Sequence, residues 1–331
     1  MIAKSFPALL QGFFTDRLLH QIQASPNTVA AYRDAFLLVF RFAAKRLDKQ
    51  PSDLTVEDLD VPFVLDFLDF LERERGSSAR TRNQRLAAIR SFYRHVAMSE
   101  PAYALHCQRV LAIPQKRHEK RMIEFLGREE IEALVAAPDT SRWLGRRDRT
   151  ILLVLAQTGL RVSELTSLRV GNVVLGKTSY IKCEGKGRKS RCTPLRADTK
   201  EALSSWIADQ MPGASAPLLP SSRGSRLSTD AVEQLVAKYV AKASRACPSM
   251  SERCITPHVL RHSAAMALRE RGVDLSVVAL WLGHESVETT QMYMHADLAL
   301  KERALARTAP IEGSSGRFHP SDKLIAFLET L

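Results

Sequence analysis

The chain has 331 residues, 45% of them hydrophobic, and a formal net charge of +12. Its length exceeds the usual size of one hydrophobic core, so two domains are expected, and the positive charge favours a polyanionic partner such as nucleic acid. Five cysteines without C-x-x-C spacing argue against a disulfide framework or a zinc ribbon and indicate a reducing, cytoplasmic setting. The sequence shows neither a signal-peptide core nor an apolar run of transmembrane length, so nucleic acid is preferred over a membrane as the partner.

A small helical domain is expected for residues 1–110. A helix-start signal at Ser25 precedes apolar residues at helical spacing, which predicts a helix over 25–46. Two more helices are expected over 61–74 and 79–98, the first of them ending at a glycine-serine stretch. The last helix would turn one row of apolar residues toward the core: Leu86, Ile89, Phe92, Tyr93 and Val96.

Five arginines occupy the other face of that helix: Arg80, Arg82, Arg85, Arg90 and Arg94. A charge run is most often a solvated helix face, but residues 77–97 contain no acidic residue to balance it. We therefore predict contact with a DNA backbone. A basic, weakly periodic stretch within 108–121 indicates a linker, placed at 111–123, whose Lys116 and Arg117 join the predicted DNA contacts.

Residues 124–308 are expected to form a second domain, which combines helices with a small antiparallel β-sheet. A helix begins near residue 128, and another covers 148–157 and breaks at Gly159. Strands are predicted at 173–175, 179–183 and 191–195, with a hairpin turn over 185–188. Further helices are expected over 198–210, 228–245, 257–271, 274–282, 286–295 and 297–307. The predicted fold class is mainly α with a small antiparallel β-sheet, followed by a tail over 309–331 that ends in a short helix.

Arg161 lies at a helix start, with Glu164 one turn further on. The helix macrodipole repels cations at this end and favours anions, so a bound phosphate would explain an arginine here. A local ion pair between Arg161 and Glu164 is the alternative.

The predicted hairpin turn gathers Lys186, Arg188 and Lys189. It is not a Walker phosphate-binding loop, because the upstream glycine and the following helix are missing. A flexible lysine on a turn can donate a proton to a leaving oxygen, and a solvated turn lysine is the plainer interpretation. Arg188 and Lys189 are further predicted DNA contacts.

Three histidines and a tyrosine complete the polar segments. His258 and His262 stand four residues apart, but the glutamate of the metalloprotease motif is absent between them, so no metal is expected. Arg261 shares a helix face with His258, which would set an imidazole and a guanidinium against one phosphate. His284 follows a glycine at a helix end, where capping is the alternative, and a lone tyrosine such as Tyr293 is usually half-buried in a core.

Taken together, these segments resemble, in order and spacing, the catalytic pattern of the tyrosine recombinase and integrase family. That pattern reads Arg, Lys, His-x-x-Arg, His and Tyr, and residues 25–97 are similar to the family's helical core-binding domain. The resemblance implies a two-domain architecture, a helical core-binding domain followed by a mixed α+β catalytic domain. It also implies five phosphate-activating residues and a nucleophile: Arg161, Lys186, His258, Arg261 and His284, with Tyr293 as the nucleophile.

The activity that the resemblance implies is a DNA strand transfer that needs no metal, ATP or other cofactor. Tyr293 would attack the phosphodiester to give a 3′-phosphotyrosyl link, and Lys186 would protonate the leaving 5′-oxygen. The implied partners are double-stranded DNA recombination sites and further copies of the chain, as dimers or tetramers on that DNA. A partner recombinase stays open, and no membrane partner is implied.

Other functions remain open at this point. Type IB topoisomerases use a similar site to relax DNA, and an accessory protein of this fold would bind DNA without cleaving it. Among recombinases, residues 294–331 after the tyrosine favour an integrase or transposase of a mobile element over an Xer-type resolvase of chromosome or plasmid dimers. An apolar stripe in the tail would dock on its own domain or on a neighbouring protomer: Leu324, Phe327, Leu328 and Leu331.

Overall fold

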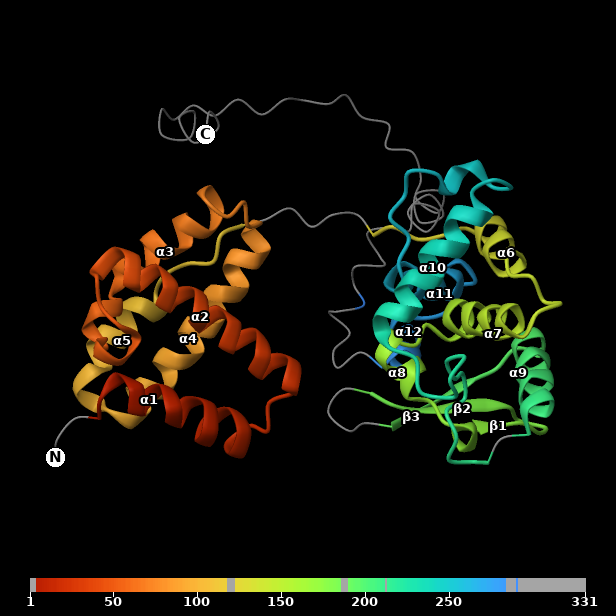
Figure 1. The fold of residues 1–331 in the computed structure, drawn as a ribbon, viewed down its shortest axis with the longest axis horizontal. Coiled ribbons are helices and arrows are strands. Elements are labelled where there is room, and N and C mark those ends of the chain that lie inside the picture. Colours follow the sequence, from red (N-terminus) through yellow and green to blue (C-terminus); the bar gives the residue numbers. More distant parts are fainter. Residues whose placement is uncertain (1–3, 118–122, 186–189, 212, 284–289, 291–331) are drawn as a thin grey trace, which may run out of the picture. The chain divides into compact units, whose positions relative to one another are not determined.

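The computed structural model describes residues 4–117, 123–185, 190–211, 213–283 and 290. The chain divides into two compact units, an N-terminal unit, Met1–Lys120, and a C-terminal unit, Arg121–Leu331 (Figure 1). Each unit has its own hydrophobic core. The described residues are mainly helical, and their strands form a single three-stranded antiparallel sheet, so the predicted fold class is confirmed.

The N-terminal unit is helical throughout its described part. Its α-helices are α1 (Phe6–Gly12), α2 (Pro26–Leu47), α3 (Val61–Arg73), α4 (Ala79–Ser99) and α5 (Ala104–Leu111). A π-helical segment, η1 (Phe13–Gln21), continues α1, and three-residue 3₁₀ turns lie at η2 (Pro51–Asp53), η3 (Glu57–Leu59) and η4 (Pro101–Tyr103). No element was predicted for residues 6–21, and residues 108–111 were expected to belong to the basic, weakly periodic stretch that precedes the second domain. The structure forms helix in both places.

Short polar side chains begin three of these helices. Ser25 and Ser78 each accept a hydrogen bond from the backbone N–H three residues on, at 3.2 Å, and Asp60 does the same at 2.9 Å. Such caps satisfy backbone donors that have no partner within the helix. The helices predicted over 25–46, 61–74 and 79–98 therefore form within a residue or two of the expected bounds.

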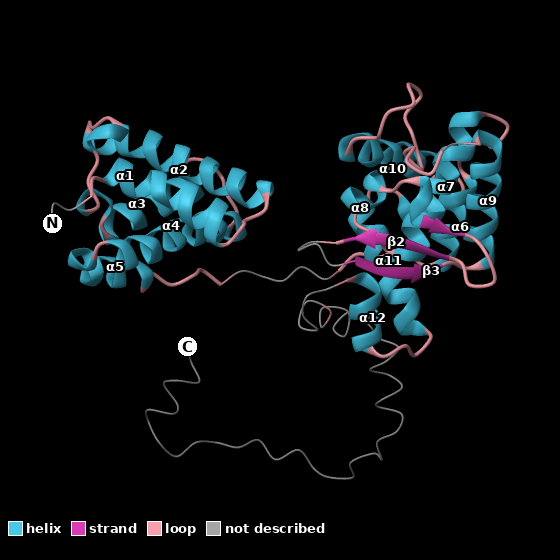
Figure 2. Cartoon of the chain, turned by 90° about the horizontal axis from the view of Figure 1, so that it is seen from below, coloured by secondary structure: helices cyan, strands magenta, loops and turns pink. Residues whose placement is uncertain are grey.

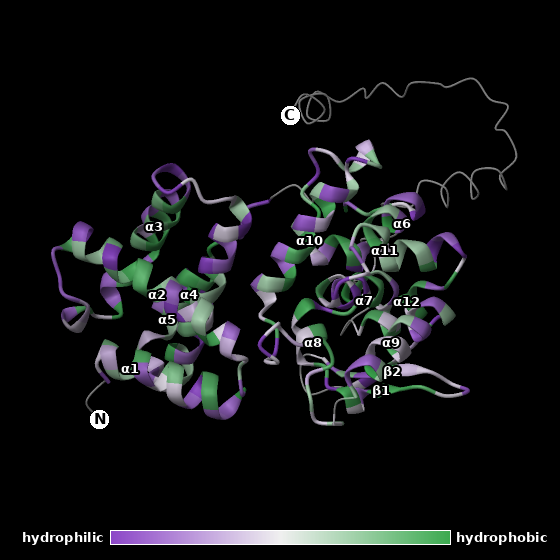
Figure 3. Ribbon diagram, turned by 45° about the vertical axis from the view of Figure 1, so that its right-hand side comes forward, coloured by the Kyte–Doolittle hydropathy of each residue, from purple (hydrophilic) through white to green (hydrophobic). Residues whose placement is uncertain are grey.

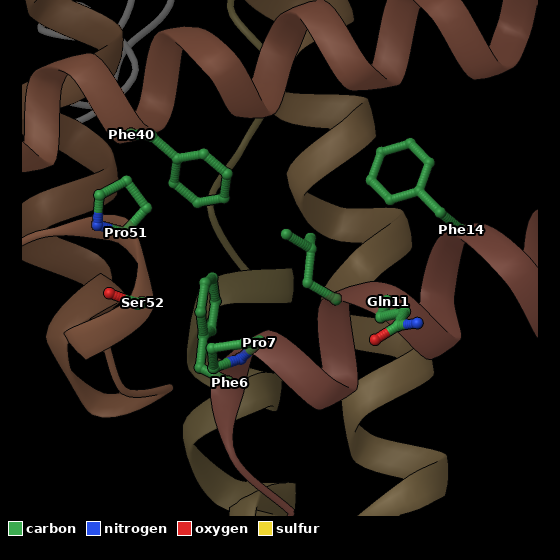
Figure 4. A pocket seen from close by; sticks show the side chains of 8 residues that line it. Phe6, Pro7, Gln11, Phe14, Phe40, Pro51 and Ser52 are labelled. Atoms are coloured by element: carbon green, nitrogen blue, oxygen red, sulfur yellow. The ribbon is translucent and has the colours of Figure 1, made fainter.

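Aromatic rings hold the N-terminal core together. Phe92 of α4 meets Phe6, Phe13 and Phe36 edge to face, with ring centroids 5.3–5.7 Å apart. Edge-to-face pairs of this kind add about 0.5–1.5 kcal/mol each beyond their buried area. All five apolar residues that were expected to face inward from α4 are buried. A small apolar pocket lies between α1, α2 and η2 in this unit, lined by Phe6, Pro7, Leu10, Gln11, Phe14, Phe40, Pro51 and Ser52 (Figure 4).

The C-terminal unit combines helices with the sheet. Its α-helices are α6 (Arg128–Ala136), α7 (Trp143–Thr158), α8 (Val162–Ser167), α9 (Ala197–Gln210), α10 (Thr229–Ala243), α11 (Pro257–Glu270) and α12 (Leu275–Leu282). The strands are β1 (Val173–Val174), β2 (Tyr180–Glu184) and β3 (Ser190–Pro194), in the order β1-β2-β3. Two 3₁₀ turns, η5 (Val170–Asn172) and η7 (Pro248–Met250), complete the described elements.

Helix α7 is the centre of this unit. Most of its residues are buried, and it packs against α6, α9 and α11. Figure 1 shows the sheet at one edge of the unit, and Figure 2 shows the strands from below. Figure 3 shows hydrophilic and hydrophobic residues alternating along the helices of both units. The helix begins at Trp143 rather than at residue 148. Asp148, in its second turn, is buried and accepts hydrogen bonds from the Arg147 guanidinium at 2.7 Å and from the Tyr239 hydroxyl at 2.9 Å.

Five cysteine thiols are free. None of the helices in the described part of the chain is long and apolar enough to cross a membrane. Apart from residue 290, the helices predicted over 286–295 and 297–307 and the short helix predicted at the end of the tail lie outside the described residues.

The interpretation of Arg82 as part of an outer arginine face is wrong. Its side chain is only 10% exposed and lies 3.6 Å from the Glu72 carboxylate of α3, which also accepts a bond from the Lys116 ammonium at 2.9 Å. The neighbouring Asn83 bonds both the backbone N–H and the carbonyl of Lys116. Thus Glu72 supplies the negative charge that is missing from residues 77–97, and residue 116 is tied to the N-terminal unit.

Replacing Arg82 is therefore expected to cost stability. Arg82→Ala removes one partner from a largely buried ion pair, so the free energy of unfolding should fall by about 1–3 kcal/mol. The matched control is Arg80→Ala on the same helix, where the side chain is exposed and the change should stay within about 0.5 kcal/mol. Urea unfolding followed by circular dichroism measures both, and equal effects would show that the Glu72 contact contributes nothing.

Candidate active site

The turn from α7 to α8 meets α11 and the end of α12 at Gly159. Gly159 has φ +63°, a left-handed conformation that ends α7. A Cβ built on this glycine would lie 2.7 Å from Leu282 Cδ2 and 3.3 Å from Ala264 Cβ. Two constraints therefore favour glycine at this position: the left-handed backbone angle and the close approach of α11 and α12.

Arg261 ties these segments together from the first turns of α11. Its residue is 2% exposed, its Nη1 donates to the Gly159 carbonyl at 2.5 Å, and its Nη2 donates to the Leu282 carbonyl at 2.8 Å. Both carbonyls lie at helix C-termini, where they lack a partner within the helix and the macrodipole favours a cation. A buried guanidinium at this point therefore fastens the ends of α7 and α12 to α11.

Arg161 approaches the same place from the start of α8. Its backbone N–H donates to Glu164 Oε2 at 2.8 Å, and its Nη1 donates to Glu164 Oε1 at 2.9 Å. The ion pair considered as the alternative for Arg161 is thus present. Its Nη2 lies 3.4 Å from the carbonyl of Gly283, the residue after Leu282, and 35% of the side chain is exposed. Arg161 and Arg261 therefore converge on consecutive carbonyls at the end of α12.

A second arginine binds the Glu164 carboxylate. Arg191 of β3 donates from Nη1 and Nη2 to the two oxygens of Glu164, at 3.0 and 2.8 Å. Burial alone would raise the pKa of Glu164, but the hydrogen bonds from Arg191 and from the Arg161 backbone, together with both positive charges, lower it. Glu164 is therefore ionised and pairs with two guanidiniums, so together with Arg261 at the end of α12 the local positive charge exceeds the negative charge.

Two histidines lie side by side on α11. Thr256 and Pro257 begin this helix, and the His258 and His262 rings meet edge to face with centroids 4.5 Å apart. His258 is exposed and His262 half-buried. Burial, together with His258 and Arg261, lowers the pKa of His262 to about 4, so His262 is neutral near pH 7. Among the residues that the structure describes, no three His, Cys, Asp or Glu side chains gather as a metal site requires.

Five predicted site residues lie outside the described residues: Lys186, Arg188, Lys189, His284 and Tyr293. The chain on either side of residues 186–189 is described, and there Glu184 of β2 pairs with Ser190 of β3. Gly283, which precedes His284, is also described and contacts Arg161. The structure thus brings Arg161 and Arg261 together and places His258 on the helix that carries Arg261.

Sequence reasoning missed Arg191. The available signal was a charged residue one position into a short strand, directly after the basic turn. That signal does not reveal the partner, since Glu164 lies 27 residues earlier in the chain. Only the packing of β3 against α8 joins the two.

Comparison with known proteins covers both units. The phage integrase N-terminal SAM-like domain matches residues 12–100, and the phage integrase family matches residues 124–299. The integrase/recombinase y4rC of Sinorhizobium fredii is 49% identical over 327 residues, 99% of this chain and 98% of the relative. The tyrosine recombinase XerC of Pelotomaculum thermopropionicum is 34% identical over 281 residues, 82% of this chain and 88% of the relative.

Solved structures show the same fold. XerH recombinase, bound to a palindromic difH substrate in a post-cleavage complex, superposes with a TM-score of 0.70 at 21% identity, over 86% of this chain and 80% of that one. The Tn1549 transposon integrase, in complex with transposon right end DNA, gives a TM-score of 0.65 at 14% identity, over 90% and 99% of the two chains. The resemblance drawn from the sequence motifs is confirmed, and the chain belongs to the phage integrase family, as a site-specific tyrosine recombinase.

Proposed function

We propose that this recombinase cuts and rejoins double-stranded DNA through a 3′-phosphotyrosyl intermediate formed on Tyr293. The observation that carries the proposal is the convergence of Arg161 and Arg261 on consecutive carbonyls at the end of α12. Phosphodiester transfer develops negative charge on the non-bridging phosphate oxygens, and fixed guanidiniums stabilise that charge without reorganising. Two such groups supply the charge that other phosphoryl-transfer enzymes take from a metal ion.

The reaction balances through the predicted residues. The Tyr293 oxygen bonds to phosphorus as the bond from phosphorus to the 5′-oxygen breaks. Lys186 gives its proton to the departing 5′-oxygen, His258 assists removal of the tyrosine proton, and His284 adds a hydrogen-bond donor to the phosphate. Rejoining reverses these steps, and because the covalent link conserves the energy of the broken bond, no ATP, metal or other cofactor is required.

His262 supports the proposed role of His258. A neutral imidazole packed edge to face against His258 limits the positions that its ring can take and adds no competing positive charge. His258 itself is exposed and so lies where substrate can reach it. Because a group that transfers a proton must lie within reach of the reacting atom, the exposure of His258 supports its proposed role.

The DNA contacts are proposed along α4 and on basic segments of both units. Arg80 and Arg94 are exposed and Arg85 and Arg90 half-buried, while buried Arg82 leaves the set. The proposed contacts are Arg80, Arg85, Arg90, Arg94, Lys116 and Arg117, together with Arg188 and Lys189. The net charge of +12 supports this assignment, since neutralising DNA phosphates releases bound counterions.

Assembly on paired DNA sites is part of the proposal. A lambda integrase tetramer bound to a Holliday junction shares the fold, with a TM-score of 0.62 at 19% identity. We propose that this chain likewise passes from dimers to a tetramer on its recombination sites. The helix predicted at the end of the tail, whose residues lie outside the described part of the chain, is proposed to dock on its own domain or on a neighbouring protomer.

The proposed cellular role is integration or transposition of a mobile element in the cytoplasm. Similarity to an integrase/recombinase over 99% of the chain supports this role. An Xer-type resolvase is the second candidate, supported by the 34% identity to a XerC. Resolution of a plasmid dimer that lacks the element's ends would favour the second candidate.

Tyr293→Phe is expected to abolish covalent attachment to DNA while leaving binding within about twofold, because only the attacking oxygen is lost. A library of nicked genomic duplexes is incubated with the protein in EDTA, and DNA that stays with the protein after a denaturing wash is sequenced. Wild type should retain DNA. The matched control is Tyr180→Phe in β2, which removes a phenol oxygen elsewhere and should also retain it. An adduct on Tyr293→Phe, or none on wild type, would refute the proposal.

Stability of the recombinase should depend on pH through His262. Its folded pKa of about 4 lies below the ordinary value of 6.5, so unfolding takes up a proton between these values and stability is lost as pH falls through that window. One full proton changes the unfolding free energy by about 1.4 kcal/mol per pH unit, and a half-buried group by less. His262→Asn should therefore narrow the difference between urea midpoints at pH 5 and pH 7. An unchanged difference would contradict the shifted pKa.

A further inference from the structure

Arg191 contacts two parts of the site from outside the predicted catalytic set. Its side chain is 11% exposed, and both terminal nitrogens bind Glu164, whose own side chain is 4% exposed. Glu164 in turn binds the backbone and the guanidinium of Arg161. Arg191 therefore acts on Arg161 through a shared, buried carboxylate.

The same guanidinium packs against Gly283. A Cβ built on Gly283 would lie 2.6 Å from Arg191 Nη1 and 3.1 Å from Arg191 Cζ, and Gly283 has φ +65°. No other residue type fits here without moving Arg191. Gly283 also accepts a hydrogen bond from Arg161 and precedes His284 in the chain. Arg191 therefore contacts a residue that adjoins two predicted catalytic residues.

Removing Arg191 would change how Glu164 is neutralised. The carboxylate now has two cations and shares its oxygens between them. With Arg191 gone, Arg161 would be the remaining cation among these contacts, and a buried carboxylate held by one arginine favours the bidentate arrangement. Arg161 would be drawn toward Glu164 and away from a phosphate.

We propose that Arg191 is a positioning residue for strand cleavage, which rests on the proposed function. By binding Glu164 on both oxygens it keeps Arg161 directed at the scissile phosphate, and by packing against Gly283 it fixes the chain that leads into His284. Arg191 is also the second residue of β3, so it links the start of this strand to Arg161 through Glu164.

The test measures single-turnover formation of the covalent complex on a nicked duplex, with full-length protein at saturating concentration, beside the dissociation constant for the same DNA. Arg191→Met should slow the covalent step by about 100-fold and change the dissociation constant less than about threefold. Arg191→Lys keeps the charge but cannot bind both oxygens in one plane, so its rate of covalent attachment should lie between the rates of wild type and Arg191→Met. Lys182→Met on the exposed face of β2 is the control and should react like wild type.

A double variant separates positioning from mere folding. Glu164→Gln removes the charge that would capture Arg161, so Arg191→Met combined with Glu164→Gln should react at least about tenfold faster than Arg191→Met alone. Replacing both partners of a buried pair is also often neutral for stability, so this variant serves if Arg191→Met fails to fold. A double variant that folds but reacts no faster than Arg191→Met, or wild-type rates in Arg191→Met, would overturn the inference. No adduct in wild type would instead refute the proposed function.

Discussion

The buried guanidinium of Arg261 is the interaction on which the catalytic unit depends. It bonds to one carbonyl at the end of α7 and to another at the end of α12, and it does so from inside α11. Three helices, of which α7 lies far from the other two in the sequence, are thereby held at one point, and a left-handed glycine ends both α7 and α12 there. Burying a charge is costly unless it is paired or fully hydrogen-bonded, and two helix C-termini provide carbonyl acceptors with the right polarity. The fold and the proposed phosphate site therefore use the same side chain.

Glu164 organises the rest of the positive charge. It begins α8 by accepting from the Arg161 backbone, which offsets the unfavourable position of an arginine at a helix N-terminus. It also joins Arg161 to Arg191, and so joins α8 to the sheet. Because one carboxylate is shared by two arginines, the cluster is fixed in place yet keeps an excess of positive charge. A fixed cluster of this kind suits the binding of an anion that gains charge in the transition state.

The sequence predicted local structure well, and it failed where partners come from other elements. Helix caps at Ser25 and Ser78 and the apolar row of α4 are local signals, and the structure has them as expected. The positive charge of Arg82 has no acidic partner within residues 77–97, because Glu72 lies on a different helix. Arg191 went unnoticed for the same reason, since its partner belongs to α8. The family motifs indicated which residues belong to the site, but only packing shows that Arg161 and Arg261 meet at the end of α12.

In the proposed mechanism, Arg161 stabilises negative charge on the scissile phosphate. The most direct measurement compares wild type and Arg161→Ala on two nicked duplexes, one with an ordinary scissile phosphate and one with a neutral methylphosphonate at that position. Arg161→Ala keeps the backbone N–H that begins α8, so the helix start is preserved. On the ordinary phosphate, Arg161→Ala should slow covalent attachment by about 10²–10³-fold. On the methylphosphonate, which lacks the charge, the loss should shrink to about tenfold or less. An equal loss on both substrates would contradict the account.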